Sequence, residues 1–475
     1  MNILMITSEA VPFSKSGGLA DVVGALTPAL IEKGHDARII VPSYGTSLDN
    51  SGSLVCELEI EMLNGPERVE IRQKTVGKTI YYFLCHKVFN LRKGIYGDTS
   101  YAPYSDNFFR FALLSKAALQ LCEKINWKPD ILHCHDWTAG LVPYFLKVSR
   151  SQFFMGTETV FTIHNLAYQG TFARMDFLYA NVKPDEELFT NGQVNMLKVG
   201  LIFSDCITTV SPAYAKEIQT PEQGCGLDTV LQKRSAKLKG IINGIDTDEW
   251  NPHTDKLIPH RFSKNNMEGK AKTKKELQIR LGLPVRGNVP VFAMISRLAA
   301  QKGFDTVLLC LEKILKENDV QFVIVGTGDS NLEKRLKELG EKHKNLSVNI
   351  LFSNEIAHLV EAGSDFFLMP SRYEPCGLNQ LYSLRYGTIP IAHRTGGLAD
   401  TIIDVEQFPK EGTGLLFNAL NPEEITKHVI RAVELYHRNN GKEISKIRMR
   451  AMSQNFSWSA SADEYIEVYK ALIEK

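Results

Sequence analysis

Charged side chains beside glycine turns are the residues of this chain best suited to chemistry. Lys15 and Asp21 bracket a turn with Gly17 and Gly18, which follows the apolar run 3–6 and precedes an apolar periodic run. This order predicts a strand, a glycine turn and a helix. Glycines let the backbone approach a ligand, and the N–H groups at a helix start favour an anion. The pattern predicts a phosphate at this turn, and a tight turn without a ligand is the structural alternative.

The same glycine turn occurs again near the other end of the chain. The residues Gly-Gly-Leu-Ala-Asp are repeated at 396–400, directly after the apolar run 389–392. One copy lies in each half of the chain. The repetition favours a ligand-binding turn over a turn with a purely structural role in both halves.

Two cations bracket another predicted strand-to-helix loop. Arg297 and Lys302 follow the apolar run that ends at Ile295. Cations near a helix start oppose the helix dipole, so their presence favours an anion that compensates them. The alternative is an ordinary solvated surface.

An acidic side chain follows the predicted strand that ends at Met369. Glu374 stands directly before Pro375, a residue suited to the first position of a helix. A carboxylate at this position can accept hydrogen bonds from sugar hydroxyl groups. The alternative is an N-terminal cap.

Hydroxyl recognition is also suggested by two other segments. His164 and Asn165 follow the run 159–163, and an imidazole beside an amide suits hydroxyl groups, although a lone histidine at a strand end is more often structural. Tyr96 begins a tyrosine-rich stretch at 96–104, and such side chains can stack on sugar rings. Packing of the phenylalanines that follow is the alternative.

Metal and nucleotide-binding motifs of other kinds are weak or absent. His133 and His135 resemble metal ligands, but no third ligand cluster accompanies them. Asp246 and Asp248 could hold a divalent cation, yet they lie in a predicted linker. No Gly-x-Gly-x-x-Gly follows the first strand, which weakens a dinucleotide oxidoreductase, and no Gly-x4-Gly-Lys-Ser/Thr occurs, which excludes a P-loop NTPase.

Strand-like and helical runs alternate along the whole chain. The runs are mostly continuous and apolar, as in strands buried on both faces, and the segments between them, such as 108–123 and 304–316, have helical periodicity. The strand-like runs lie at residues 3–7, 37–41, 80–84, 131–134, 159–163, 206–210, 289–295, 321–325, 348–352, 365–369 and 389–392. This alternation predicts parallel sheets flanked by helices.

The sequence divides into two α/β domains. Between 244 and 289 lie polar linker residues and a charged run at 270–276, which we interpret as the first helix of a second domain. We predict a domain over residues 1–246, a second over 247–455 and a terminal helix within 456–475. Both would be doubly wound, with ligands beyond the carboxyl ends of the strands and a cleft between the domains.

The composition limits the class of protein. The chain has 475 residues, of which 44% are hydrophobic, and 55 basic residues balance 54 acidic ones to a net charge of +1. A general nucleic-acid binder should show a basic excess, so we expect no nucleic-acid partner. No signal peptide and no apolar run of the ~20 residues needed to span a bilayer are found. With eight scattered cysteines, a cytoplasmic location is expected.

Together these motifs resemble the bacterial glycogen synthase and plant starch synthase family. The resemblance spans almost the whole chain. The motifs that carry it are residues 15–21, 164–165, 243–246, 296–303, 374–378 and 394–400.

The resemblance implies a retaining glycosyltransferase of the GT-B architecture, with two Rossmann-like domains and a deep cleft between them. The expected partners are ADP-glucose as donor and an α-1,4-glucan such as glycogen as acceptor, with glucose transferred to the non-reducing 4-hydroxyl group. No metal and no cofactor are implied. The domain at 1–246 would carry acceptor and catalytic groups, the domain at 247–455 would bind the nucleotide sugar, and the helix in 456–475 would return to the first domain.

The resemblance also implies roles for individual residues. Arg297 and Lys302 would bind the diphosphate, Glu374 would contact the glucosyl hydroxyl groups, and Phe352 would lie against the adenine. The catalytic set so implied is His164, Glu374, Arg297, Lys302 and Asp136. The substrate-binding set is Lys15, Gly17, Gly18, Asp21, Asn165, Asn243, Phe352, Cys376, Gly377, Leu378 and Asn379, to which the tyrosine-rich stretch adds Tyr96.

Some positions depart from related sequences. Related two-domain transferases often carry a second Glu eight residues after the first, where this chain has Tyr382, as is usual in this subgroup. The family motifs most often have other residues at three further positions, which are Ser16, Thr27 and Asn379 in this chain. Asn379 lies near the expected phosphate contacts.

Other functions remain open at this point. A related enzyme could use UDP-glucose or another acceptor, and a regulator could bind a nucleotide sugar on the same fold without catalysis. Residue types alone do not decide between ADP-glucose and UDP-glucose. They do not predict the oligomeric state, allosteric control or preferred glucan length either.

Overall fold

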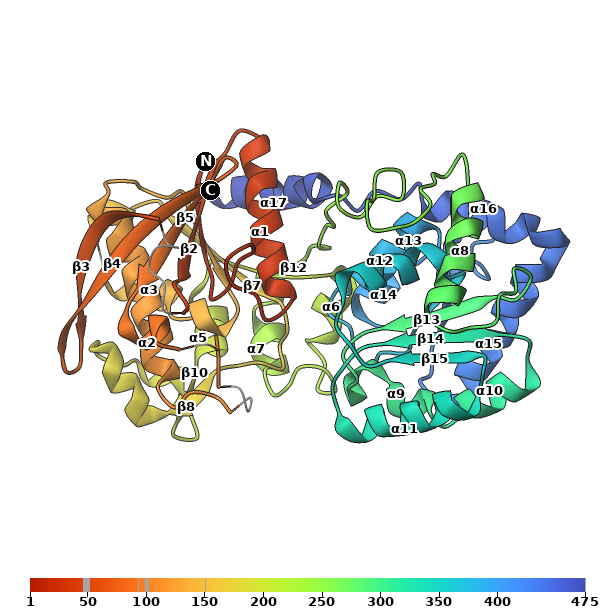
Figure 1. Cartoon of the computed structure of the whole chain (residues 1–475). Coiled ribbons are helices and arrows are strands. Elements are labelled where there is room, and N and C mark those ends of the chain that lie inside the picture. Colours follow the sequence, from red (N-terminus) through yellow and green to blue (C-terminus); the bar gives the residue numbers. More distant parts are fainter. Residues whose placement is uncertain (46–51, 93, 99–101, 150, 475) are drawn as a thin grey trace. The chain divides into compact units, whose positions relative to one another are not determined.

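The computed structural model describes residues 1–45, 52–92, 94–98, 102–149 and 151–474. These residues form two compact units (Figure 1). Unit 1 comprises Met1–Gly244 together with Trp458–Lys475, and unit 2 comprises Ile245–Ser457.

A mixed sheet forms the centre of unit 1. In the described part of the chain it has nine strands in the order β12-β11-β7-β6-β1-β2-β5-β4-β3. The strands are β1 (Asn2–Ile6), β2 (Asp36–Pro42), β3 (Ser53–Met62), β4 (Gly65–Val76), β5 (Thr79–Cys85), β6 (Ile131–His135), β7 (Glu158–Ile163), β11 (Cys206–Thr209) and β12 (Leu238–Gly240). From β12 to β5 the strands are parallel, whereas β4 pairs antiparallel with β3 and with β5.

Helices flank this sheet. They are α1 (Gly18–Glu32), α2 (Lys87–Asn90), α3 (Asn107–Lys124), α4 (Val142–Ser149), α5 (Met196–Phe203), α6 (Pro212–Glu217), α7 (Asp228–Lys233) and α17 (Trp458–Ile473). A small antiparallel sheet contains β8 (Thr171–Ala173), β9 (Phe189–Thr190) and β10 (Gln193–Asn195). Short 3-10 turns lie at Trp137–Ala139, Gln152–Phe154, Arg174–Ala180, Glu186–Leu188 and Ser235–Lys237.

The last helix of the chain completes the core of unit 1. Tyr465 and Tyr469 of α17 are buried in one apolar cluster with Leu26 of α1 and Ile3 of β1. α17 lies against α1 (Figure 1), and Lys33 at the end of α1 pairs with Asp463. Because these side chains are apolar and recur at helical spacing, their burial stabilises the return of the chain to unit 1.

Unit 2 is a parallel doubly wound domain. Its strand order is β15-β14-β13-β16-β17-β18, and every pairing is parallel. The strands are β13 (Val291–Ile295), β14 (Gln321–Val325), β15 (Leu346–Asn349), β16 (Phe366–Met369), β17 (Ile389–His393) and β18 (Leu415–Phe417). Apolar clusters cover both faces of the sheet, as expected for strands that read as continuous apolar runs.

The helices of unit 2 connect these strands. They are α8 (Glu268–Arg280), α9 (Phe304–Val307), α10 (Leu311–Glu317), α11 (Ser330–Lys342), α12 (Asn354–Gly363), α13 (Asn379–Tyr386), α14 (Gly396–Thr401), α15 (Pro422–His437) and α16 (Lys442–Ala451). Two 3-10 turns lie at Ala300–Lys302 and Arg438–Gly441.

The charged first helix of unit 2 is buried along one side. Lys274 of α8 donates to Asp365 at 2.6 Å, and Arg448 donates to the other oxygen of the same carboxylate at 2.6 Å. Lys270 donates to two backbone carbonyls and to Thr388. Because the ammonium groups of Lys270 and Lys274 both have hydrogen-bond acceptors, these lysines can be buried. α8 therefore packs against the core without the continuous apolar face that core-facing helices usually have.

A buried ion pair joins the linker to α12. Nδ1 of His358 donates to the Asp255 carboxylate at 2.7 Å, and the ring of His358 stacks on that of Trp250 with 3.8 Å between the ring centroids. Burial opposes charge on the ring, but the bond to Asp255 and the nearby Glu249 carboxylate outweigh it and raise the pKa of His358 to about 9. The imidazole is therefore protonated at neutral pH.

We expect the stability of unit 2 to fall as the pH rises through about 9. A raised folded-state pKa gives stability that is complete below the unfolded value of about 6.5 and lost above the folded value. The loss amounts to at most about 3 kcal/mol. Urea unfolding at pH 6.5 and pH 9.5 measures it. In His358→Gln the difference between the two pH values should be smaller, and an equal difference would contradict this role.

The structure confirms the predicted α/β class and also shows where local predictions were wrong. The predicted helix 304–316 is two helices, α9 and α10, separated by a turn. The predicted strand 348–352 ends at Asn349, because the N–H of Leu351 donates to the carbonyl of Asn349 and forms a turn. Phe352 therefore lies in a loop, and its side chain is 94% exposed. The strands β3 and β4 were not predicted.

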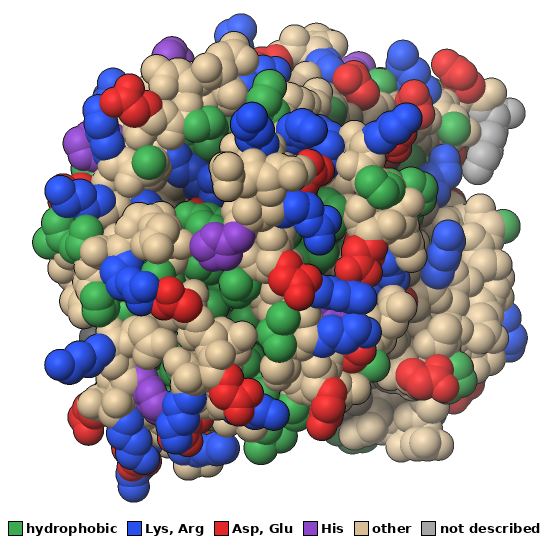
Figure 2. Space-filling model, turned by 90° about the vertical axis from the view of Figure 1, so that its right-hand side faces the viewer, with side chains coloured by type: hydrophobic (Ala, Val, Ile, Leu, Met, Phe, Trp, Pro, Cys, Tyr) green, Lys and Arg blue, Asp and Glu red, His purple; other side chains and the backbone are tan. Residues whose placement is uncertain are grey.

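Basic and acidic side chains are intermixed on the face of the molecule that Figure 2 shows. That face has no large region of a single sign, in agreement with the net charge of +1. Among the described residues, no helix is both long enough and apolar enough to cross a membrane.

Candidate functional site

Both sheets change their direction of winding next to the predicted site residues. In unit 1, β1 lies between β2 and β6, so the winding reverses between β1 and β6. In unit 2, β13 lies between β14 and β16, and the winding reverses between β13 and β16. Ligands of doubly wound sheets bind beyond the carboxyl ends of the strands at such points. The candidate site of unit 1 is therefore formed by the segments that follow β1 and β6, and that of unit 2 by the segments that follow β13 and β16.

The segment after β1 forms a network around Glu9, which the sequence analysis did not single out. The buried Glu9 carboxylate accepts from the N–H groups of Ser16 and Gly17, from the Ser16 hydroxyl at 3.0 Å and from Tyr96 at 2.7 Å. The ring of Tyr96 also packs near Trp137. A polar Ser-Glu pair directly after a buried strand was the available signal for this residue.

The Glu9 network changes the interpretation of the first glycine turn. The N–H groups of Ser16 and Gly17 already hold a carboxylate, which satisfies the positive end of α1. They are therefore not free for a phosphate, contrary to the simplest prediction from the glycine pattern. A side-chain atom added at Gly17 or Gly18 would meet nothing within 4 Å, so the protein's own packing does not require these glycines.

Two predicted charges lie at the outside of the same turn. Lys15 pairs with Asp21 at 2.7 Å, and the side chains are 51% and 34% exposed. An exposed pair of this kind is worth little to stability. Lys15 can therefore exchange Asp21 for a ligand at small cost.

Asp136, directly after β6, has an unusual backbone conformation and a shifted pKa. Its φ of 54° and ψ of −175° lie in a region that is nearly restricted to glycine. Its carboxylate accepts from the N–H of His164 at 2.8 Å. Burial raises the pKa of the Asp136 carboxyl to about 7, and the N–H groups of His164 and Asn165 oppose this rise only in part. Strain and a shifted pKa together are typical of functional sites.

Asp136→Asn should make the stability of unit 1 less dependent on pH. A carboxyl with a raised folded-state pKa loses its stabilising effect as the pH rises from about 4 to about 7, because the unfolded chain gives up this proton in that range while the folded protein keeps it. The amide of the variant cannot ionise. We therefore expect the unfolding free energy of wild type, minus that of the variant, to fall between about pH 4 and about pH 7 and to stay constant above about pH 7. Denaturant unfolding at pH 5, 6, 7 and 8 measures the difference. A difference that does not change with pH would contradict the pKa.

Three histidines of unit 1 lie close together, with His133 and His135 buried and His164 half-buried. His133 contacts Tyr469 of α17 at 2.7 Å and Thr162 at 2.6 Å, and Nδ1 of His135 lies 3.0 Å from Nε2 of His164. Burial lowers the pKa of His133 and of His164 to about 3, and the pKa of His135 well below its ordinary value. His164 is therefore neutral at physiological pH and suited to hydrogen bonding with a hydroxyl group rather than to ion pairing.

One predicted amide of unit 1 has an unmet hydrogen-bonding group. Asn243 is buried, and its Oδ1 has no hydrogen-bond partner among the described residues. Asn165 is engaged locally, since its Oδ1 accepts from the N–H of Ala167 at 3.1 Å. A buried acceptor without a partner costs free energy unless a ligand or water supplies the donor. The predicted tyrosine-rich stretch lies partly outside the described residues, at 99–101.

Unit 2 brings Lys302 and Glu374 together. Nζ of Lys302 donates to the buried Glu374 carboxylate at 2.5 Å, and Ser371 donates to the same oxygen at 3.0 Å. These residues follow β13 and β16, the two strands at the reversal of winding. The pair therefore lies at the expected ligand position, with a cation and a carboxylate within one hydrogen bond of each other.

The second glycine turn positions the Glu374 loop. A side-chain atom added at Gly396 would lie 2.0 Å from the carbonyl oxygen of Glu374, and one at Gly397 would lie 2.0 Å from that of Cys376. Gly396 also has a φ of 45°, and the N–H of Gly397 donates to the Glu374 carbonyl at 3.0 Å. The repeated motif thus packs closely here, unlike its open counterpart at Gly17.

Arg297 is the exposed cation of this site. Its one hydrogen-bond contact among the described residues is a long one of 3.5 Å to Gln301. Gln301 itself contacts the backbone of Tyr373, and Arg372 pairs with Asp305 nearby. The guanidinium of Arg297 is therefore available to an anion.

The remaining predicted residues of unit 2 surround the start of α13. Asn379 donates to the carbonyl of Ile295 at 2.5 Å, which ties this helix to the end of β13. Gly377 has a φ of 73°, and no side chain caps the helix at Leu378. Cys376 is buried. A helix start without a side-chain cap suits an anion.

A metal-binding cluster is not present among the described residues. No group of three or more His, Cys, Asp or Glu side chains there could hold an ion. Asp246 accepts from the N–H groups of Asp248 and Glu249, so it stabilises its own turn.

Solved structures resemble the whole chain. The catalytic domain of Starch Synthase IV from Arabidopsis thaliana, bound to ADP and acarbose, superposes with a TM-score of 0.89 at 32% identity, covering 100% of this chain and 99% of that one. A sucrose-phosphate synthase from Thermosynechococcus elongatus, at 18% identity and a TM-score of 0.62, shows the fold alone. A model of glycosyl transferases group 1 matches residues 277–448. The fold and the site define a glycosyltransferase of the GT-B class.

Sequence comparisons narrow this class. A model of the starch synthase catalytic domain matches residues 2–233. A glycogen synthase of Treponema denticola is 43% identical, covering 100% of this chain and 99% of the relative, and one of Myxococcus xanthus is 44% identical, covering 100% of both. The chain belongs to the glycogen synthase and starch synthase family, and it is a glycosyl-transferring enzyme. The alternative of a non-catalytic regulator is thereby set aside.

Proposed function

We propose that the enzyme transfers glucose from ADP-glucose to the non-reducing 4-hydroxyl group of an α-1,4-glucan, with retention of configuration. The observation that carries this proposal is the cluster of Arg297, Lys302 and Glu374 at the reversal of winding in unit 2. Support for the donor comes from the Arabidopsis structure, which holds ADP, and support for the acceptor comes from relatives named glycogen synthase.

The cations act on the leaving group. When the bond between the glucosyl carbon and the phosphate oxygen breaks, negative charge builds on the departing ADP. Arg297 and Lys302 stabilise that charge. Preorganised donors of this kind are commonly worth about 10²–10³ in rate each. The reaction needs no metal in this proposal.

Glu374 and the polar groups of unit 1 position the sugars. Glu374 accepts hydrogen bonds from glucosyl hydroxyl groups, and binding of the donor draws Lys302 from the carboxylate toward the phosphate. Neutral His164 and the unpartnered oxygen of Asn243 offer hydrogen bonds to uncharged hydroxyl groups. Exposed Phe352 offers a face for the adenine.

Glucose incorporation into glycogen tests this proposal. ADP-glucose and UDP-glucose are supplied in parallel, each with excess chelator. Incorporation from ADP-glucose in the presence of chelator is the expected result. Incorporation from UDP-glucose alone would overturn the donor, a requirement for added metal would overturn the cationic mechanism, and no incorporation from either would overturn the assigned reaction.

We also propose a cytoplasmic location for the enzyme, because its eight cysteines are scattered along the sequence, as is usual where thiols stay reduced. Fractionation of the cells that make it, followed by detection of the protein, tests the location. Recovery with a membrane or extracellular fraction would overturn it.

A further inference from the structure

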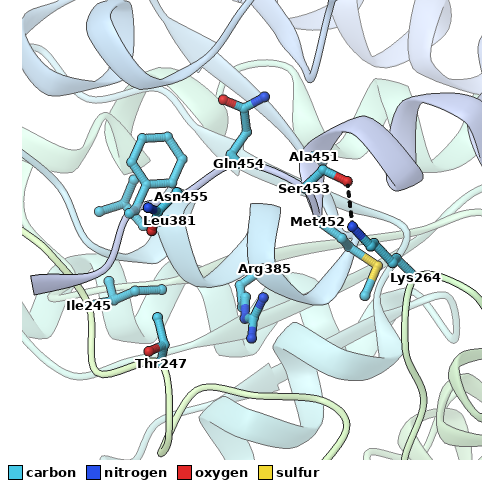
Figure 3. A pocket seen from close by; sticks show the side chains of 11 residues that line it. Ile245, Thr247, Lys264, Leu381, Arg385, Ala451, Met452, Ser453, Gln454 and Asn455 are labelled. Carbon is cyan, nitrogen blue, oxygen red and sulfur yellow. Dashed lines mark hydrogen bonds between the residues drawn. The ribbon is translucent and has the colours of Figure 1, made fainter. Parts of the chain in front are cut away.

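A polar cavity lies within unit 2 and contains none of the predicted site residues. It has a volume of about 230 Å³ (Figure 3). Its polar lining residues are Thr247, Lys264, Arg385, Ser453, Gln454 and Asn455, and Leu381, Met452 and Phe456 add apolar surface. The cavity is smaller than the ~300 Å³ at which sites for drug-sized ligands begin, so its size suits a small ligand.

The charge in this cavity is entirely positive. Lys264 and Arg385 line it, and no acidic side chain is among the lining residues. The closest acidic residue in sequence is Asp246, whose carboxylate accepts from the backbone of its own turn. Lys264 makes a long bond of 3.3 Å to the Ser453 hydroxyl, a neutral acceptor (Figure 3). Two cations without a counter-charge in one polar cavity favour an anion.

Arg385 shows the strongest sign of a missing ligand. Its Nε is buried and has no hydrogen-bond partner among the described residues, and no ion pair of its guanidinium is found there either. Its position in the last turn of α13 explains a cation, because the helix dipole is negative there, but it gives Nε no acceptor. A buried donor without an acceptor destabilises the fold, and an anion that enters the cavity would supply an acceptor.

The cavity also contacts both segments that connect the two units in sequence. The chain enters unit 2 at Ile245 and leaves it at Ser457. Ile245 and Thr247 line the cavity from the first segment, and Asn455 and Phe456 line it from the second. The N–H of Ile245 donates to the carbonyl of Phe456 at 2.8 Å, so the two segments are paired directly. A ligand here would contact both segments at once.

We propose that this cavity binds a small phosphate-bearing anion, which pairs with Arg385 and Lys264 and holds the two connecting segments together. Planar guanidinium groups bind phosphate oxygens with two parallel hydrogen bonds, and a lysine adds a point charge. Inorganic phosphate and a sugar monophosphate share this chemistry. The site is separate from the donor site, because none of its lining residues belongs to the cluster around Glu374.

Calorimetric titration of the full chain tests the proposal. Saturating ADP is present throughout to occupy the donor site, and inorganic phosphate is the probe. The expected result is one bound phosphate, with a dissociation constant weakened about tenfold or more in Arg385→Met and in Lys264→Met. Lys275→Met is the matched control, because Lys275 is exposed on α8 and does not line the cavity. Phosphate binding that is equal in wild type and both variants would overturn the proposal.

Two further measurements complete the test. Hydrogen exchange should show phosphate-dependent protection of peptides that contain 245–247 and 453–456 in wild type and in Lys275→Met, and no protection there would overturn the link to the connecting segments. A second titration with glucose 1-phosphate distinguishes the sources. Tighter binding of the ester than of phosphate assigns a sugar monophosphate, and weaker binding assigns free phosphate. If Arg385→Met unfolds, Lys264→Met carries the comparison, because Lys264 is exposed.

Discussion

Arg297→Ala is expected to lower kcat about 10²–10³-fold while the melting temperature stays within about 2 °C of wild type. The side chain is exposed, and its one hydrogen bond among the described residues is the long one to Gln301, so its removal should disturb the fold little. The guanidinium therefore has only this weak bond to lose and, in the proposed reaction, an anionic leaving group to stabilise. Initial rates at saturating ADP-glucose and glycogen measure the effect.

A matched surface arginine is the control for this prediction. Arg335 on α11 is also exposed and has no role in the site, so Arg335→Ala should leave kcat unchanged. Arg297→Lys keeps the charge but loses the planar fork, and it should recover part of the rate. Near-normal turnover of Arg297→Ala would falsify the role of this residue in stabilising the departing diphosphate.

Glu374→Gln is expected to reduce kcat by about two orders of magnitude, since it weakens the hydrogen bonds to the glucosyl group. It also removes the carboxylate that Lys302 holds at 2.5 Å. Because the two side chains form one unit, the double variant Lys302→Met/Glu374→Gln should lose much less than the product of the two single losses. Steady-state kinetics of all four proteins measure this coupling.

Two results would count against the assigned role of Glu374. Turnover of Glu374→Gln within about threefold of wild type would exclude an important contact with the reacting sugar, and strictly multiplicative losses in the double variant would exclude the coupling. Glu355→Gln is the control, because Glu355 forms an exposed ion pair with Arg280 on the surface of the same unit. Its rate should equal that of wild type.

The sequence allowed the α/β class and most parallel strands to be predicted, because buried strands read as continuous apolar runs. β3 and β4 were missed for the opposite reason. Every second residue of β3 near its end is exposed, so this antiparallel pair alternates between polar and apolar side chains and has no continuous apolar run. The division of 304–316 into two helices depends on a local turn that apolar spacing does not reveal.

The sequence allowed many residues of the candidate site to be named, but it did not show which of them contact one another. Lys302 and Glu374 were both singled out, but their ion pair joins positions 72 residues apart, which spacing along the chain cannot show. The burial of Lys274 likewise depends on Asp365, 91 residues away. The Glu9 network also depends on tertiary structure, because Tyr96 reaches this carboxylate from a distant loop. The roles of these residues in catalysis stay predictions until the variants are measured.

The return of α17 to unit 1 has a consequence for the order in which the enzyme can be made. Unit 2 is one continuous segment, Ile245–Ser457, and it lies in sequence between the two parts of unit 1. The core of unit 1 stays open until residues 458–473 emerge, because Tyr465 and Tyr469 fill it. During synthesis the apolar side of α1 therefore stays uncovered while the more than two hundred residues of unit 2 are translated. A chain truncated after Ser457 and released from the ribosome should bind chaperones through unit 1, whereas its unit 2 can fold.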